Sequence, residues 1–365
     1  MAEIFSSWKI GKLEIANRLV RSATWEGLAR EDGQVVDRLV DAYAQLAKNK
    51  VGLIITSNLF VDADGKAQVG QAGIHNNDML PGLSRLVEAV YKHKGVIAAQ
   101  LAHSGGNTKS ALIGGKKPHG PSKYFNPLHQ QEVEELSLGQ IEDIIEKFGK
   151  AAKRARAVGF DAIELHLAHG YLANQFLNPA TNQRQDNYGQ PYLFALNSYK
   201  QVRQEVGSDC PVFIKINSED SHEGMQTIEN VLPLMKDFNQ LGLDAVEVSG
   251  GLRLGVTYQD SQLSSSRKAM KPEEEGYFFD NAVAIKQVVD FPVISVGGWR
   301  SRARVEEALN QVDAIAMSRP FIAQPDLAEQ WQRGVSKSKC ISCDKCFALN
   351  AEFGLSCILN MNKNK

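Results

Sequence analysis

The chain has 365 residues, of which 43% are hydrophobic and 23% charged, the ordinary composition of a globular protein. Its formal net charge of −1 at pH 7 argues against nucleic acid or a membrane surface as a partner. The sequence has no apolar run of the roughly 18 residues that a membrane-spanning helix needs, and its N-terminus has no long apolar core. We therefore expect no transmembrane helix and no signal peptide, and predict a cytoplasmic protein.

Short apolar runs alternate with amphipathic stretches from one end of the chain to the other. In chain order, the predicted strands cover residues 17–24, 51–58, 95–103, 160–169, 210–218, 243–251, 291–298 and 312–319. Helical patterns follow them at 34–49, 78–94, 138–158, 192–207, 226–241, 277–290, 301–310 and 320–333. Alternating strands and helices favour parallel pairing, and eight such units predict a (β/α)8 TIM barrel. A doubly wound open sheet is the rival, but its glycine-rich dinucleotide motif is missing after the first strand.

Side-chain alternation within three strands brings polar groups into the barrel near the C-terminal ends of those strands. The residues predicted to point inward are Val96, Ala98, Gln100, Ala162, Glu164, His166, Phe213, Lys215 and Asn217. Active sites of such barrels lie at that end. The long segments 104–137 and 252–276 both follow strands, so we expect them to lie over the barrel mouth.

The last two strands end in groups suited to phosphate. Strand seven ends in Gly297-Gly298, and strand eight ends in Ser318-Arg319. Barrels of this type frequently bind phosphate between these two loops, where glycine permits close backbone approach and arginine supplies a charged fork. The alternative is a tight glycine turn with Arg319 paired to a surface carboxylate.

Strand four leads into a long polar stretch, "HLAHGYLANQFLNPATNQRQDNYG", at residues 166–189. His166 and His169 have a spacing that occurs in metal sites, but no third ligand is evident nearby. The pair could instead hold a substrate oxygen, with Tyr171 as proton donor, because a phenol of pKa about 10 is protonated at neutral pH. For His166 alone, the alternative is a hydrogen-bonded core histidine. The Asn, Arg and Asp groups that follow are expected to pin the loop.

This stretch resembles the corresponding motif of the Old Yellow Enzyme family, flavin-dependent ene-reductases and NADH:flavin oxidoreductases built on a TIM barrel. The segments "NRLVRSAT", "QLAHSGG", "FIKINSED", "ISVGG" and "AMSRPFIAQPDL" extend the resemblance over essentially the whole chain. It implies FMN as cofactor, NADH or NADPH as reductant, and a small activated alkene such as an α,β-unsaturated carbonyl compound as substrate. It also implies that His166 and His169 hold the carbonyl oxygen and that Tyr171 donates the proton.

The resemblance further implies which residues contact FMN. Gln100 and Lys215 would face the polar edge of the flavin ring, and the two strand-end loops would hold the phosphate. The full implied set is Ala23, Thr24, Ser57, Gln100, Lys215, Gly297, Gly298, Ser318 and Arg319.

Two positions depart from the family pattern. Lys215 stands where many relatives carry arginine, which keeps the positive charge but loses the bidentate fork. Trp25 stands where relatives place Thr or Cys beside the flavin. We expect Trp25 to narrow the space above the ring and to alter the substrate range.

Four of the five cysteines lie near the end of the chain. Cys340, Cys343, Cys346 and Cys357 have the spacing C-x2-C-x2-C-x10-C, which resembles an iron–sulfur motif more than a zinc ribbon. A similar motif marks the branch that includes trimethylamine dehydrogenase and 2,4-dienoyl-CoA reductase, where it binds a [4Fe–4S] cluster. Zinc and free thiols are the alternatives. We therefore divide the chain into an FMN-binding barrel, 1–335, and a Cys-rich C-terminal extension, 336–365.

The sequence thus predicts an FMN-dependent NAD(P)H oxidoreductase of the ene-reductase type. One alternative is a flavin-dependent dehydrogenase or demethylase of amines or related substrates. Others are a phosphate-binding barrel lyase with structural zinc and a non-catalytic Fe–S/flavin redox sensor. A homo-oligomeric state and an electron-transfer partner acting through the cluster are further expectations.

Overall fold

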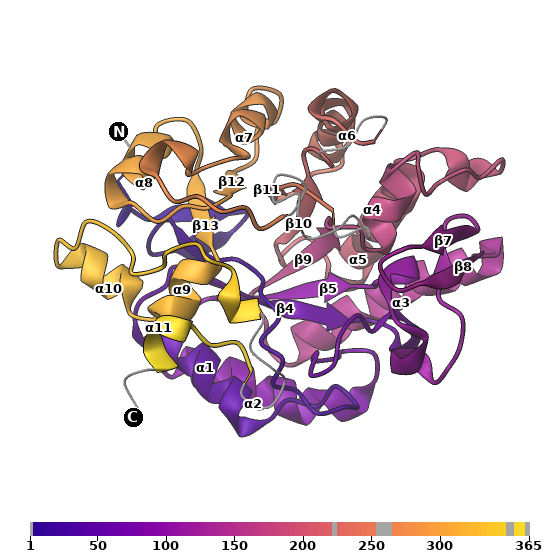
Figure 1. Cartoon of the computed structure of the whole chain (residues 1–365), viewed down its shortest axis with the longest axis horizontal. Coiled ribbons are helices and arrows are strands. Elements are labelled where there is room, and N and C mark those ends of the chain that lie inside the picture. Colours follow the sequence, from indigo (N-terminus) through magenta and orange to yellow (C-terminus); the bar gives the residue numbers. More distant parts are fainter. Residues whose placement is uncertain (1–2, 221–224, 253–264, 348–353, 362–365) are drawn as a thin grey trace.

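A closed barrel of eight parallel strands forms the centre of the molecule, with helices around it (Figure 1). The computed structural model describes residues 3–220, 225–252, 265–347 and 354–361. The barrel strands are β3 (Leu19–Arg21), β4 (Leu53–Phe60), β5 (Ile97–Ala102), β9 (Ala162–Leu167), β10 (Val212–Asn217), β11 (Ala245–Ser249), β12 (Val293–Val296) and β13 (Ala314–Met317). Each falls within a predicted strand or overlaps it, so the TIM-barrel prediction is confirmed.

The helices follow the predicted ranges except at the end of the barrel. Those found are α1 (Asp37–Lys48), α2 (Leu80–Tyr91), α3 (Leu138–Ala157), α5 (Leu193–Val206), α6 (Ile228–Gln240), α7 (Phe279–Lys286) and α8 (Arg302–Ala308). The single helix predicted over 320–333 is wrong: α9 (Arg319–Ala323) and α10 (Leu327–Gln332) replace it. Pro325 disfavours helical backbone in the residue before it, and Gln324 accordingly leaves the helix with φ −154° and ψ 81°.

Two layers of apolar side chains stabilise the barrel. Ile163 and Leu165 of β9 point outward into the core shared with the helices, whereas Phe213 of β10 points into the barrel, as the alternation predicts. An N-terminal hairpin, β1 (Trp8–Ile10) and β2 (Leu13–Ile15), was not predicted. Its apolar residues join the interior cluster, and the Trp8 indole donates to the Asn17 carbonyl ahead of β3. The hairpin therefore closes the N-terminal end of the barrel and leaves the opposite end for a site.

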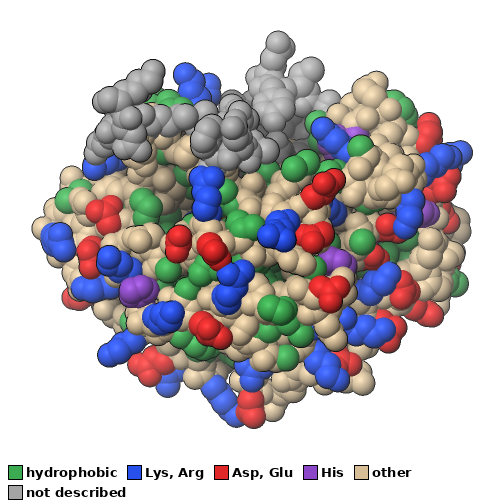
Figure 2. All heavy atoms as spheres, turned by 90° about the horizontal axis from the view of Figure 1, so that it is seen from below, with side chains coloured by type: hydrophobic (Ala, Val, Ile, Leu, Met, Phe, Trp, Pro, Cys, Tyr) green, Lys and Arg blue, Asp and Glu red, His purple; other side chains and the backbone are tan. Residues whose placement is uncertain are grey.

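The segment 104–137 holds a small three-stranded sheet: β6 (His119–Gly120), β7 (Tyr124–Asn126) and β8 (Gln131–Glu135). In the other predicted mouth segment, residues 253–264 lie outside the described part of the chain. Figure 2 shows that acidic and basic side chains are intermixed over the face in view. Within the described ranges, no helix is long and apolar enough to cross a membrane.

Candidate active site

Two adjoining cavities open at the C-terminal ends of the barrel strands. The β12–β13 cavity, of about 390 Å³, is lined among others by Gly298, Ser318 and Arg319. The β4–β9 cavity, of about 540 Å³, is lined among others by Gln100 and His166. The two cavities share Ala23, Thr24, Trp25, Gln68, His169, Lys215 and Ser265. Together they form one continuous site of the size that a cofactor and a substrate would occupy.

The His166, His169 and Tyr171 side chains meet at this site. The ring of His166 lies 5.2 Å from that of His169 and 4.8 Å from that of Tyr171, both edge-on. His169 has φ +60°, a strained left-handed conformation for a residue with a side chain. Its N–H donates to Asn217 Oδ1 at 3.2 Å, and its Nε2 lies 2.8 Å from Ser249 Oγ. Neighbouring strands thus hold His169 in a geometry that its own backbone disfavours.

A short helix directly after Tyr171, α4 (Leu172–Leu177), supplies the polar groups that fix this turn. Asn174 Oδ1 accepts the Gly170 N–H at 2.7 Å. The Gln175 amide donates to the carbonyls of Ser104 and Gly170 at 3.0 and 2.7 Å. The polar side chains that follow β9 therefore hydrogen-bond to the backbone of the loops at the barrel mouth and do not face solvent.

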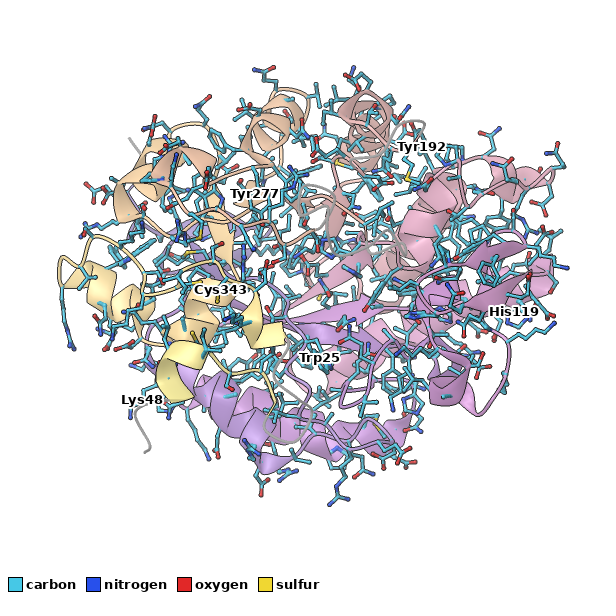
Figure 3. All side chains as sticks on the ribbon, in the orientation of Figure 1. Trp25, Lys48, His119, Tyr192, Tyr277 and Cys343 are labelled. Atoms are coloured by element: carbon cyan, nitrogen blue, oxygen red, sulfur yellow. The ribbon has the colours of Figure 1, made fainter. Side chains whose placement is uncertain are left out.

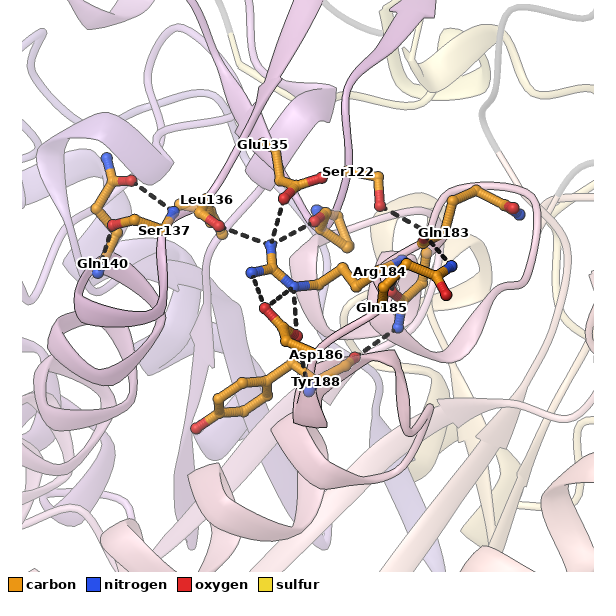
Figure 4. Close-up of polar contacts among 12 residues, drawn as sticks. Ser122, Glu135, Leu136, Ser137, Gln140, Gln183, Arg184, Gln185, Asp186 and Tyr188 are labelled. Atoms are coloured by element: carbon orange, nitrogen blue, oxygen red, sulfur yellow. Dashed lines mark hydrogen bonds and ion pairs between the residues drawn. The ribbon is translucent and has the colours of Figure 1, made fainter.

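Arg184 fastens this region to the 104–137 segment (Figure 4). Its guanidinium pairs with Asp186 and donates to the carbonyls of Pro121 and Leu136 at 2.7 and 2.6 Å. The Asn182 amide donates to the Tyr188 carbonyl at 2.9 Å. This confirms the prediction that the Asn, Arg and Asp groups pin the loop.

His166 is uncharged at neutral pH. Burial, and secondarily the positive charge of Lys215, lower the pKa of His166 to about 3. Its Nδ1 is buried and has no hydrogen-bond partner among the described residues. A neutral imidazole with one nitrogen still unsatisfied is suited to hydrogen-bond a bound ring or a substrate oxygen.

A buried polar layer lies beneath the shared wall of the two cavities. Lys215 Nζ donates to Ser22 Oγ at 2.8 Å and to Glu247 Oε1 at 3.0 Å. Gln100 Nε2 donates to Glu164 Oε2 at 2.6 Å. All five side chains are almost fully buried. Lys215 and Gln100, the two groups expected at the polar edge of a flavin ring, are thus each held from below by a glutamate.

Of the four residues expected at the phosphate, Gly298 after β12 and Ser318 and Arg319 after β13 line the β12–β13 cavity, whereas Gly297 is absent from its described lining. Gly298 has φ +75°, and a Cβ there would lie 2.7 Å from the Tyr277 ring. Gly297 supports the turn, its carbonyl accepting the Gly276 N–H at 2.6 Å. Arg300, which the sequence interpretation missed, lines the cavity and is 3% exposed. Its Nε and Nη2 have no hydrogen-bond partner among the described residues, although Glu275 lies 3.7 Å away.

Arg319 pairs with a partly exposed carboxylate, as the alternative interpretation expected, although that carboxylate belongs to the C-terminal segment and not to the barrel. It donates to Asp344 Oδ1 at 2.7 Å and to the Arg267 carbonyl at 2.8 Å. Asp344 lies between Cys343 and Cys346. The arginine expected at the phosphate therefore also ties the cysteine segment to the barrel mouth.

Ala23, Thr24 and Trp25 lie on the wall shared by both cavities. The Thr24 hydroxyl lies 2.8 Å from Ser318 Oγ. The Trp25 indole donates to the Val69 carbonyl at 3.0 Å, which fixes its ring at the cavity edge. Figure 3 labels Trp25, Tyr277 and Cys343 around the middle of the barrel face. Trp25 thus takes up space at the mouth, in keeping with the expected narrowing.

Ser57 was expected to contact the flavin, but Asn58 lines the cavity in its place. The backbone N–H of Ser57 donates to Tyr43 Oη at 2.7 Å, and Ser57 is absent from the described lining of both cavities. A register shift between Ile55 and Asn58 places a β-bulge in β4, and Asn58 pairs opposite Gln100. The bulge turns Asn58 into the β4–β9 cavity, where its amide donates to Tyr171 Oη at 2.7 Å.

The four C-terminal cysteines border one small cavity of about 10 Å³, together with Arg319 and Ile322. Cys340 also lines the β12–β13 cavity, so the C-terminal segment returns to the barrel mouth. The Asn360 amide donates to the Ala323 carbonyl of α9 at 3.0 Å, which holds α11 (Ile358–Met361) there (Figure 1). Over the described ranges, no group of three or more His, Cys, Asp or Glu side chains is arranged to hold a metal ion.

Comparison of the sequence with known protein families agrees with this fold and site. The sequence profile of the NADH:flavin oxidoreductase / NADH oxidase family matches residues 3–338. The chain belongs to this family. An NADPH dehydrogenase from Listeria monocytogenes serotype 4b is 32% identical over 338 residues, which cover 90% of this chain and 94% of the relative.

Other members of the family are longer. An NADH oxidase from Thermoanaerobacter brockii is 35% identical over 350 residues, covering 93% of this chain and 52% of the relative. A metal reductase from Desulforamulus reducens is 31% identical over 353 residues, with 51% of it covered. The chain spans about half the length of these two relatives.

Solved structures show the same fold. A 2-naphthoyl-CoA reductase complex has a TM-score of 0.86 at 24% identity, over 94% of this chain and 54% of the other. Morphinone reductase in complex with tetrahydroNAD has a TM-score of 0.78 at 23% identity, over 93% and 92% of the two chains. At these identities, the likeness concerns the fold.

Proposed function

We propose that this chain is an FMN-dependent NAD(P)H oxidoreductase of the ene-reductase type, acting on activated alkenes such as α,β-unsaturated carbonyl compounds. The observation that carries the proposal is the convergence of His166, His169 and Tyr171 on a cavity that shares a wall with the Lys215 and Arg319 side. Family membership supports the redox chemistry. The name of the similar NADPH dehydrogenase supports a reduced nicotinamide as the source of electrons.

The residues at the mouth fit FMN on two physical grounds. The buried guanidinium of Arg300 has two nitrogens, Nε and Nη2, without a hydrogen-bond partner in the described structure, and this unmet donor capacity beside its ion pair with Glu275 suits a phosphate. Gly298 forms a turn that admits no side chain, which leaves its backbone open to close approach. Arg300, Arg319, Gly298 and Ser318 would hold the phosphate, and Lys215 and Gln100 the polar edge of the ring. When bound, FMN would supply hydride to the β-carbon of the alkene.

The chain's own residues would perform the remaining tasks. His169 and the neutral His166 would donate hydrogen bonds to the carbonyl oxygen of the substrate and stabilise the negative charge that develops there. Tyr171 Oη would deliver a proton to the α-carbon, and the Asn58 amide would stabilise the phenolate that remains. Trp25 would limit the width of substrates that enter above the ring.

Replacement of the proton donor tests this proposal. In Tyr171→Phe we expect FMN binding and reduction of the flavin by NADH or NADPH to be unchanged. Reduction of an enone should slow by about 100- to 10,000-fold, the usual contribution of a positioned acid. Rapid-mixing measurements separate the two half-reactions and also establish which nicotinamide is preferred. A colourless protein without FMN, or an unchanged rate of enone reduction, would refute the assignment.

We also propose that Cys340, Cys343, Cys346 and Cys357, in the extension 336–365, bind an iron–sulfur cluster. Their spacing and the single cavity that they border support this. As they stand in the structure, the thiols do not form a ready metal site, so binding would require them to close around the cluster. We therefore assign no step of the reaction to it.

Anaerobic purification with metal and sulfide analysis tests the cluster. We expect about four iron and four sulfide per chain, lost in Cys343→Ser. The matched control is Cys210→Ser, because Cys210 is buried beside β10, apart from the other four. Stoichiometric zinc without sulfide, or no metal, would contradict the proposal. Cytoplasmic location, homo-oligomeric assembly and an electron-transfer partner stay predictions.

A further inference from the structure

Two glutamates are completely buried in the barrel interior directly below the site. Glu164 is on β9 and Glu247 on β11, and both are 0% exposed. Alternate strands of a TIM barrel contribute side chains to the same interior layer, and β10 separates these two strands. On β10, Lys215 lies opposite His166 of β9 and Glu247 of β11 in the strand register. The carboxyl groups of Glu164 and Glu247 are themselves within hydrogen-bonding reach of each other.

Each of the two carboxyl groups has one oxygen that accepts hydrogen bonds and one oxygen that has no donor among the described residues. Glu164 Oε2 accepts from Gln100 Nε2 at 2.6 Å, and Glu247 Oε1 accepts from Ser22 Oγ at 2.6 Å and from Lys215 Nζ at 3.0 Å. The remaining oxygens, Glu164 Oε1 and Glu247 Oε2, are both buried, and neither has a donor among the described residues. Two buried acceptors that lack a donor and lie on neighbouring acids can satisfy each other only through a proton.

The charges in this layer also indicate that one of the two carboxyl groups carries a proton. Lys215 is the one cation among the five side chains of the layer, whereas two carboxylates would carry two negative charges in a site without solvent. Burial, and next the charge of Glu247, raise the pKa of Glu164 well above its ordinary value. One lysine cation, one carboxylate and one neutral carboxyl make the layer electrically neutral. This protonation state has the lowest electrostatic free energy in a site of low dielectric constant.

We propose that Glu164 and Glu247 share one proton and act as a positioning pair, fixing Gln100 and Lys215 from below and setting the charge under the flavin ring. The role toward the ring rests on the proposed function, whereas the shared proton does not. Because one carboxylate always remains to offset Lys215, the pair moderates the positive potential that Lys215 presents upward. Neither glutamate touches substrate, so both act through the residues above them.

Infrared spectroscopy detects the proton without any need for flavin. We expect a C=O stretch of a neutral carboxylic acid in the wild-type protein at about pH 8, and its loss in both Glu164→Gln and Glu247→Gln. This pH lies above the pKa values of two other buried carboxyls, Glu26 and Asp220, which burial raises to about 7 and about 6. Glu26→Gln is the matched control and should keep the band.

The midpoint potential of bound FMN gives an independent readout. In each single variant, the remaining carboxyl has lost its acidic neighbour and ionises beside Lys215, so the charge under the ring and the potential stay close to wild type. The double variant Glu164→Gln/Glu247→Gln leaves Lys215 without a carboxylate, which favours the anionic reduced flavin and raises the potential.

The outcomes separate cleanly. If both glutamates are ionised, the wild type lacks the carboxylic-acid band at about pH 8 and each single variant raises the potential, which overturns the proposal. A protein that shows the band but binds no FMN keeps the shared proton and refutes the flavin function. Should a variant fail to fold, the band of the wild-type protein still decides whether the proton is present.

Discussion

The side-chain amide of Asn58, on β4, donates a hydrogen bond to the hydroxyl oxygen of Tyr171 over 2.7 Å. An N–H donor to a phenol oxygen stabilises the phenolate more than the phenol, because hydrogen bonds to charged groups are the stronger ones. This contact therefore makes Tyr171 a better acid at the position where we propose that it protonates the substrate.

Removal of the amide should slow proton transfer. In Asn58→Leu we expect alkene reduction to lose about 1.5–3 kcal/mol of transition-state stabilisation, or roughly 10- to 150-fold in rate. Asn58→Asp should be slower still, since a carboxylate opposes phenolate formation. The measurement is the rate of enone reduction in rapid mixing. In a Tyr171→Phe background the Asn58→Leu change should have no further effect, and an equal loss there would show that Asn58 acts only on folding.

The two histidines should account for the binding of phenolate ligands, which mimic an enolate oxygen. His166→Ala and His169→Ala should each cost about 1.5–3 kcal/mol of binding free energy, because each removes a hydrogen bond to a charged oxygen. Titration of the flavin absorbance with a substituted phenol measures this. The exposed His93→Ala is the control and should bind as the wild type does. Unaltered affinity in both active-site variants would place the substrate oxygen elsewhere.

Arg300 should bind the FMN phosphate. Arg300→Gln removes the Nε and Nη2 donors, which have no hydrogen-bond partner in the described structure, along with the Nη1 bond to the Cys340 carbonyl and the ion pair with Glu275, so the Kd for FMN should rise at least about 10-fold. Fluorescence titration of the apoprotein with FMN gives the affinity. Arg333→Gln, whose side chain is 76% exposed, is the matched control. If riboflavin and FMN lose affinity equally, Arg300 does not contact the phosphate.

The fold could be predicted from the sequence because its regularities are local. Outward Ile163 and Leu165 and inward Phe213 follow from period-two alternation on strands buried on both faces. The N-terminal hairpin could not be predicted in the same way, since its strands have three residues each and gain stability only by closing the barrel. The break at Pro325 was visible in the sequence and was missed.

The site was predicted where alternation holds and missed where it fails. The family resemblance implied Ser57, and alternation after Ile55 would also turn it inward, but a β-bulge that the residue pattern does not indicate places Asn58 there instead. Glu247 could have been predicted to point inward by applying to its strand the same side-chain alternation that was applied to the preceding strand. Arg300 follows Gly298 by two residues, and the pattern of the strand gave no reason to single it out. Its unsatisfied donors become evident only in three dimensions.

Glu26 provides the last prediction, which concerns stability rather than catalysis. It is buried next to Trp25, accepts from Tyr43 Oη at 3.1 Å, and lies 3.5 Å from the guanidinium of Arg21. Burial outweighs that attraction and raises the pKa of Glu26 to about 7, from an ordinary value of 4.5. The folded protein therefore keeps a proton that the unfolded chain releases.

A group with a raised pKa contributes stability at low pH that is lost as the pH rises. Between about pH 4.5 and pH 7, Glu26 should thus lower the free energy of unfolding by about 3 kcal/mol. Glu26→Gln keeps the shape without the ionisation, so the difference in unfolding free energy between variant and wild type should grow in favour of the variant over this window. Urea unfolding at several pH values measures it, with the exposed Glu14→Gln as control. A difference that stays constant with pH would mean that Arg21 keeps Glu26 ionised, and the wall behind Trp25 would then hold an ion pair instead of a neutral acid.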